Sequence, residues 1–105
     1  MKEITALELK QKIDNQEPFQ LIDVREPYEY EDANLNGELI PMAEVLENVN
    51  KIAKDKPVII HCRSGKRSAS IVNALEIQFG YDNLYNLKGG IKAYAEEIDP
   101  TLTIY

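Results

Sequence analysis

Short apolar runs typical of strands alternate along this chain with segments whose apolar residues recur at helical spacing. The strand-like runs span 19–24, 38–40, 58–61 and 83–87, and the helix-like segments span 6–13, 27–32, 42–52, 68–79 and 91–98. The run "VIIH" at 58–61 is almost fully apolar, as expected of a strand that is buried on both faces of a sheet. Strands that alternate with helices across short loops predict a three-layer α/β/α fold, in which helices cover both faces of a mainly parallel sheet of about five short strands.

The length and composition limit the possible functions. A chain of 105 residues is expected to form one domain, residues 1–105. Its net charge of −6 disfavours binding to nucleic acid or to an anionic membrane, and no apolar run approaches the roughly 20 residues that a membrane span needs. The first residues lack the apolar core of a secretion signal, and the single cysteine cannot form an internal disulfide, so we expect a cytoplasmic protein.

The only cysteine, Cys62, directly follows the predicted strand 58–61. In parallel α/β sheets, binding sites lie beyond the carboxyl ends of the strands. The stretch "CRSGKRS" at 62–68 is expected to form a tight loop that ends at the N-terminus of the helix beginning near Ser68. The free N–H groups of that helix would face the sulfur, and Gly65 would let the loop curl so that further N–H groups point inward.

The loop also carries positive charge and hydroxyl groups. Its cations and serines are Arg63, Ser64, Lys66, Arg67 and Ser68. An unperturbed thiol has a pKa of about 8.5 and is mostly protonated at neutral pH. Cations and hydrogen-bond donors near the sulfur predict a lower pKa and therefore a reactive thiolate. The alternative interpretation is a small buried side chain with no chemical role, which is common for a lone cysteine.

His61 precedes the cysteine and ends the predicted strand. A direct catalytic role is one interpretation of this histidine, and a local hydrogen bond at the end of the strand is the favoured one. The single cysteine and the single histidine fall short of the roughly three or four ligands of a usual metal site. We therefore expect no metal and no cofactor.

The stretch "CRSGKRS", together with "LIDVREPYEY" upstream and "NLKGGIKAY" downstream, resembles the rhodanese-like domain, a sulfurtransferase family. The resemblance runs from about residue 4 to residue 105. It implies that Cys62 accepts sulfane sulfur from a small anionic donor such as thiosulfate, forms a persulfide and passes the outer sulfur to a thiophilic acceptor. The resemblance places the substrate-binding loop at Arg63, Ser64, Gly65, Lys66, Arg67 and Ser68. Asp23 and Arg25 match a charge pair of the family, and we expect them to support the structure.

Two other functions fit the same residues. In one, the chain is a relay that a cysteine desulfurase loads and that delivers sulfur to a thiol or a sulfur-carrier protein. The segments "NLNGELIPMAEV" and "GGIKAYAEEIDPTLTIY" favour this, because they resemble the rhodanese domain of sulfur-carrier adenylyltransferases. In the other, the chain is a phosphatase or an arsenate reductase. Related phosphatases place the loop arginine one residue further from the cysteine, whereas four residues separate Cys62 from Arg67 here, so this function is disfavoured.

Overall fold

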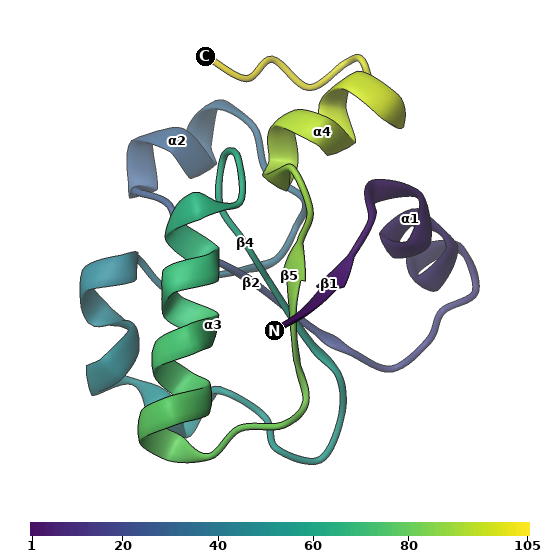
Figure 1. Cartoon of the computed structure of the whole chain (residues 1–105). Helices are drawn as coiled ribbons and strands as arrows, with labels where there is room; N and C mark the ends of the chain where they lie inside the picture. The colour runs from purple at the N-terminus through teal and green to yellow at the C-terminus, as the bar shows by residue number, and fades with distance from the viewer.

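The computed structural model describes residues 1–105, and a five-stranded sheet lies at its centre (Figure 1). The strands are β1 (Lys2–Ile4), β2 (Gln20–Asp23), β3 (Glu38–Leu39), β4 (Val58–His61) and β5 (Leu84–Leu87). Their order is β1-β5-β4-β2-β3, and every neighbouring pair is parallel. The predicted parallel sheet is confirmed, and β1 is an additional strand that the apolar pattern did not reveal.

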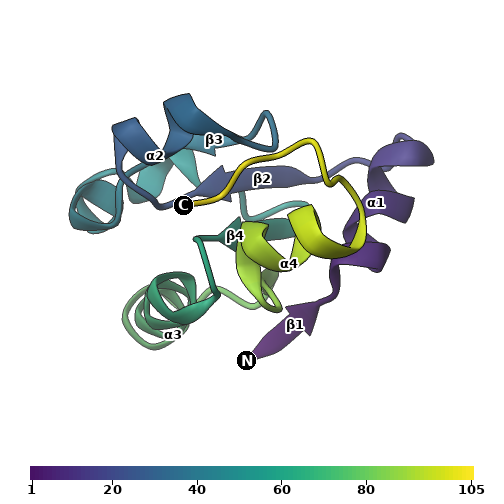
Figure 2. The ribbon, with the colours of Figure 1, turned by 90° about the horizontal axis from the view of Figure 1, so that it is seen from above.

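Helices cover both faces of this sheet, as Figures 1 and 2 show from two directions. One face carries α3 (Lys66–Phe79) and the 3₁₀ helices η1 (Met42–Glu47) and η2 (Val49–Lys51). The other face carries α1 (Ala6–Asp14) and α4 (Gly90–Glu97), which contact each other. The short helix α2 (Pro27–Asp32) follows β2. The predicted three-layer α/β/α architecture is therefore confirmed. No helix is long and apolar enough to cross a bilayer.

The central strand β4 determines which side of the sheet each following residue faces. It lies between β5 and β2, and all of its residues are buried. Because successive side chains of a strand point to opposite faces, Val58 and Ile60 pack in the core beneath α3, whereas Ile59 packs in the core beneath α1 and α4. Cys62 continues this alternation and belongs to the same core as Ile60.

Two predicted helices have different bounds in the structure. The segment 42–52 forms the two 3₁₀ helices instead of one α-helix. The chain leaves helical geometry at Asn48, where the side-chain amide donates a hydrogen bond to the Glu44 carbonyl, and such side-chain bonds compete with helix formation. Helix α3 begins at Lys66, two residues earlier than predicted, because the left-handed Gly65 is its N-cap.

Candidate active site

The Cys62 side chain lies in a tight loop between β4 and α3 and is only 1% exposed. Its Sγ accepts hydrogen bonds from the N–H of Gly65 at 3.1 Å, from the N–H of Ser68 at 3.4 Å and from the hydroxyl of Ser68 at 3.3 Å. The loop reaches this shape because Gly65 has a φ of 100°, a conformation that favours glycine. N–H groups of the loop and of the first turn of α3 therefore point at the sulfur, as the sequence predicted.

These hydrogen bonds decide the ionisation of the thiol. Burial raises the pKa of Cys62, because it removes water from the thiolate. The hydroxyl and N–H of Ser68 and the N–H groups of Gly65 and Ser64 lower the pKa, because they stabilise the negative sulfur. The second effect is larger, so the pKa of Cys62 lies below its ordinary value. The arrangement favours a thiolate in a site that excludes water.

The start of α4 holds the carbonyl side of the same loop. The N–H of Ile91 donates to the Cys62 carbonyl at 2.9 Å, and the N–H of Lys92 donates to the Arg63 carbonyl at 3.0 Å. This close approach requires Gly90, because a Cβ at that position would lie 2.3 Å from the Arg63 carbonyl oxygen. With its carbonyls bound to α4, the loop keeps its N–H groups directed at the sulfur.

Asn86 in β5 contacts this loop as well, although the sequence did not identify it. The side chain is 3% exposed, its Nδ2 donates to the Gly65 carbonyl at 3.1 Å, and its Oδ1 accepts from the Ser68 hydroxyl at 2.6 Å. The Ser68 hydroxyl has one hydrogen and two acceptors, Asn86 Oδ1 and Cys62 Sγ. An asparagine within an otherwise apolar strand was the available signal for this contact.

The expected cluster of cations around the sulfur requires correction. The two terminal guanidinium nitrogens of Arg67, Nη1 and Nη2, donate hydrogen bonds to the Glu29 carboxylate at 2.8 and 3.0 Å. Arg63 donates through Nε to the Tyr105 carbonyl at 2.7 Å, and Lys66 is exposed. The hydrogen bonds from Arg67 hold the pKa of Glu29 at about 2, so this carboxylate stays charged and balances Arg67. The direct donors to the sulfur are N–H groups and one hydroxyl.

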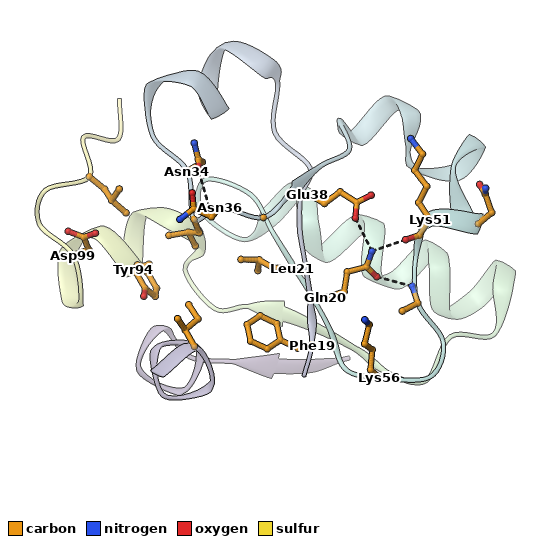
Figure 3. A pocket seen from close by; sticks show the side chains of 16 residues that line it. Phe19, Gln20, Leu21, Asn34, Asn36, Glu38, Lys51, Lys56, Tyr94 and Asp99 are labelled. Carbon is orange, nitrogen blue, oxygen red and sulfur yellow. Dashed lines mark hydrogen bonds between the residues drawn. The ribbon is translucent and has the colours of Figure 1, made fainter. Parts of the chain in front are cut away.

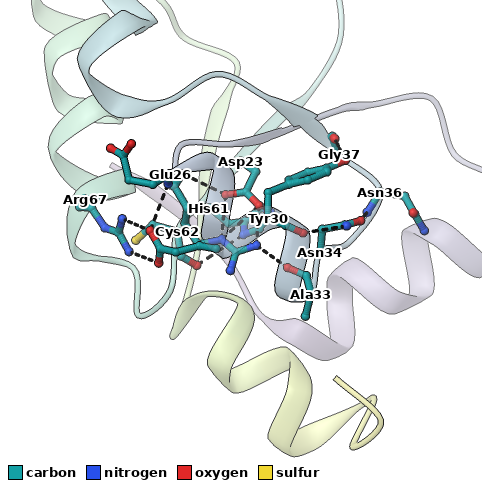
Figure 4. Close-up of polar contacts among 12 residues, drawn as sticks. Asp23, Glu26, Tyr30, Ala33, Asn34, Asn36, Gly37, His61, Cys62 and Arg67 are labelled. Atoms are coloured by element: carbon teal, nitrogen blue, oxygen red, sulfur yellow. Dashed lines mark hydrogen bonds and ion pairs between the residues drawn. The ribbon is translucent and has the colours of Figure 1, made fainter. Parts of the chain in front are cut away.

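Asp23 and Arg25 form a buried ion pair, and Figure 4 shows Asp23 beside His61. Nη2 of Arg25 lies 2.8 Å from Asp23 Oδ2 and also donates to the Ala33 carbonyl, and the two side chains are 2% and 0% exposed. Buried charges of this kind need their partner, which agrees with a supporting role. The Arg25 side chain donates to the Asp23 carboxylate and to the Ala33 carbonyl, and it donates no hydrogen bond to Cys62 Sγ.

His61 is fully buried and turned away from the sulfur. Its Nε2 lies 3.6 Å from Asp23 Oδ2 without a hydrogen-bond partner, and its Nδ1 lies 3.4 Å from the Cys62 carbonyl oxygen. Burial lowers the pKa of His61, so the ring is neutral at neutral pH. No three of the His, Cys, Asp and Glu side chains are grouped closely enough to hold a metal ion.

Several cavities open on the surface, and two of them bear on the search for the site. A groove of about 810 Å³ lies over β2, with Phe19, Leu21 and Tyr94 among its lining residues (Figure 3), and no residue of the cysteine loop contributes to it. A smaller cavity of about 250 Å³ adjoins the loop. It is lined by Arg25, Tyr28, Glu29, Asp32, Arg63 and residues 103–105. The smaller cavity is the one next to the thiol-bearing loop.

Comparisons with known proteins agree with this geometry. The family model described as "Rhodanese-like domain" matches residues 5–97. The chain is 36% identical over 101 residues to the putative sulfurtransferase YtwF of Bacillus subtilis, and the match covers 95% of this chain and 96% of that protein. A crystal structure of a rhodanese-like domain protein from Staphylococcus aureus is 36% identical and superposes with a TM-score of 0.82 over 100% of this chain and 99% of that one.

A longer relative matches as well. The chain is 32% identical over 105 residues to the probable adenylyltransferase/sulfurtransferase MoeZ of Mycobacterium tuberculosis, covering 97% of this chain but only 26% of that protein. The chain thus spans about a quarter of the length of this relative, which agrees with the predicted likeness to sulfur-carrier adenylyltransferases. Relatives named as sulfurtransferases support a role in sulfur transfer. The fold, the cysteine loop and the match over residues 5–97 together show that the chain belongs to the rhodanese-like domain family.

Proposed function

We propose that the chain is a sulfurtransferase that carries sulfane sulfur as a persulfide on Cys62. The observation that supports this most directly is the set of hydrogen bonds to Sγ from Gly65 and Ser68. Donors in this arrangement stabilise an anion bound at the loop. The thiolate and the persulfide are both anions, so one set of donors serves the protein before and after it accepts sulfur.

The reaction needs no redox partner. In loading, the Cys62 thiolate attacks the sulfane sulfur of thiosulfate, a new S–S bond forms, the S–S bond of thiosulfate breaks, and sulfite leaves with the electron pair. The persulfide keeps the single negative charge of the thiolate. In unloading, a thiophilic acceptor such as cyanide or a thiolate attacks the outer sulfur, and Cys62 leaves as the thiolate. Residues 63–68 bind the sulfur groups in this proposal, and Asp23 and Arg25 support the loop.

A second candidate is a persulfide relay that receives sulfur from a cysteine desulfurase and gives it to a thiol or a sulfur-carrier protein. The observation that favours it is the engagement of both loop arginines. Arg67 is paired with the Glu29 carboxylate, and Arg63 donates through Nε to the Tyr105 carbonyl, so both guanidinium groups already have partners that a small dianion would have to compete with. The two candidates share the persulfide on Cys62 and differ in the donor.

Intact mass spectrometry tests the proposal and separates the two candidates. The protein is incubated with thiosulfate alone, or with a cysteine desulfurase and L-cysteine, and we expect a gain equal to one sulfur atom. Cyanide should remove the added sulfur as thiocyanate. Cys62→Ser should gain nothing, because the chain has no other cysteine. Sulfur retained on Cys62→Ser, or no gain by the unsubstituted chain from either donor, would refute the proposal.

A further inference from the structure

The pair of Glu29 and Arg67 joins two helices beside the thiol. Glu29 lies on α2 and Arg67 in the first turn of α3, and their side chains are 15% and 35% exposed. The Glu29 carboxylate accepts hydrogen bonds from both terminal guanidinium nitrogens of Arg67, and its Oε1 also accepts a hydrogen bond from the N–H of Glu26 at 3.1 Å. Such two-pronged pairs between arginine and carboxylate are strong and fixed in geometry. Glu29 therefore takes two of the five N–H donors of this guanidinium and offsets its charge.

The cavity next to the loop is lined by charges of both signs. Glu29 and Asp32 both contribute carboxylates to its lining. Of its two arginines, Arg25 is neutralised by Asp23, and Arg63 donates through Nε to the Tyr105 carbonyl and keeps its positive charge. The charge of Arg67 does reach the sulfur, because the Cys62 thiolate stabilises the protonated Arg67. A change at Glu29 therefore alters the field that both the thiolate and an approaching donor experience.

We propose that Glu29 is a specificity-determining residue that disfavours dianionic sulfur donors relative to monoanionic ones. The inference rests on the proposed sulfur transfer through Cys62. Glu29 acts by placing a fixed negative charge in the lining of the cavity next to the cysteine loop and by accepting two hydrogen bonds from Arg67. The work of bringing a donor past a fixed charge is proportional to the charge of that donor. Glu29 therefore penalises thiosulfate, which carries two negative charges, more strongly than a donor that carries one.

Two related donors isolate this effect. Thiosulfate is a dianion, and methanethiosulfonate is a monoanion that presents the same sulfane sulfur on a sulfonyl group. In each case the Cys62 thiolate attacks the sulfane sulfur, the S–S bond of the donor breaks, and sulfite or methanesulfinate leaves with the electron pair. Both reactions form the same persulfide on Cys62, and cyanide then removes its outer sulfur as thiocyanate. The donors differ in charge and in one oxygen, which a methyl group replaces.

The test compares kcat/KM for the two donors in Glu29→Gln. Glutamine keeps the size of the side chain and can still accept the Glu26 N–H, so α2 retains its cap. For an assumed separation of about 8 Å between this charge and the donor, and an effective dielectric constant of about 60, between those of a protein surface and of bulk water, removing the charge should raise kcat/KM about threefold for the monoanion and about tenfold for the dianion. The ratio of thiosulfate to methanethiosulfonate activity should thus rise about threefold. Rates are measured above the pKa of the thiol, so that its ionisation does not enter.

Two controls separate the charge of Glu29 from other effects. Glu31→Gln removes the same charge from an exposed position of α2 and should leave the ratio unchanged. The double variant Glu29→Gln with Arg67→Gln removes both members of the neutral pair, so the ratio should return to within about twofold of that of the unsubstituted protein. If the ratio of thiosulfate to methanethiosulfonate activity stayed raised in the double variant, the net charge of the Glu29–Arg67 pair would not be what sets the ratio.

The outcomes distinguish this inference from the proposed function. If Cys62 accepts sulfur from either donor but Glu29→Gln leaves the ratio unchanged or lowers it, the role of Glu29 is wrong and the sulfurtransferase proposal stands. If neither donor nor a desulfurase loads Cys62, the proposed function is wrong, and the inference falls with it. A rise of the ratio in Glu29→Gln alone supports both.

Discussion

Replacing Ser68 with alanine tests which groups make the thiol acidic. The hydroxyl is one of the donors to Cys62 Sγ, at 3.3 Å, and the substitution removes it while keeping the Ser68 N–H in place. The pKa of Cys62 should rise, because the thiolate loses a hydrogen bond that burial prevents water from replacing. The free energy of unfolding should fall by about 1–3 kcal/mol, because the buried Asn86 Oδ1 loses the hydrogen bond that the Ser68 hydroxyl donates, whereas alanine itself suits the first turn of α3.

The size of the effect follows from the two acceptors of this hydroxyl. A hydrogen bond to a charged acceptor contributes about 1.5–3 kcal/mol. When the thiol ionises, the hydroxyl turns from Asn86 Oδ1, a neutral acceptor at 2.6 Å worth about 1 kcal/mol, to the sulfur. The difference is about 0.5–2 kcal/mol. Since 1.4 kcal/mol is about a factor of ten in an equilibrium constant, the thiolate fraction should fall about tenfold at a pH below the thiol pKa.

The rate of alkylation by iodoacetamide, followed against pH, measures this fraction. The midpoint of the profile should move to higher pH in Ser68→Ala. Ser64→Ala is the matched control, because Ser64 acts on the sulfur through its backbone N–H and its side chain is exposed. That variant should keep the midpoint of the unsubstituted protein. An unchanged midpoint in Ser68→Ala would show that backbone N–H groups alone set the ionisation, and an equal change in Ser64→Ala would show a general effect of altering the loop.

Two further substitutions test how the loop is supported. Gly90→Ala should lower the free energy of unfolding in two ways: by about 1–2 kcal/mol because the backbone is left-handed, and by about 1–3 kcal/mol more because the new Cβ meets the Arg63 carbonyl. The same substitution should raise the pH at the midpoint of the alkylation profile. Gly80 has the same left-handed backbone, but a Cβ there would lie in open space, so in urea unfolding Gly80→Ala should lose only the free energy that the backbone accounts for. Equal losses of stability in the two variants would show that the close contact of α4 with the loop does not contribute. Arg25→Met should cost about 3–5 kcal/mol, because it leaves the buried Asp23 carboxylate without its partner. A loss below about 1 kcal/mol in the same unfolding assay would show that the ion pair does not support the fold.

Local patterns were sufficient to predict the parts of the fold that the chain builds from neighbouring residues. The apolar run of β4 and the helical spacing of apolar residues within α1 and α3 predicted these elements. The strand β1 was missed, because two of its three residues are exposed and it becomes a strand only by pairing with β5. The first turn of α3 was missed because Lys66 and Arg67 carry no apolar pattern.

In the site, too, features built from neighbouring residues were predictable, and contacts between distant segments were not. The order of strand, loop and helix was enough to predict that N–H groups face Cys62. The partners of Arg67 and Ser68 were not predictable, because Glu29 lies 38 residues from Arg67 and Asn86 lies 18 residues from Ser68. Charge counted along the sequence therefore overstated the positive field at the sulfur. The positive charge that acts at the sulfur depends on contacts between elements, such as that of Arg67 with Glu29, and these contacts follow from the order of the strands.

The alternation of side chains along β4 has a consequence for proton movement. It directs His61 toward Asp23 and away from Cys62 Sγ, so the sulfur has no adjacent general acid or base. Sulfur exchange between anions does not need one, because the charge lost by the attacking thiolate reappears on the persulfide and the leaving group. The pH–rate profile of loading should accordingly rise along a single limb to a plateau instead of forming a bell. Deuterated solvent should slow the plateau rate very little, because no proton is transferred in the step that transfers the sulfur.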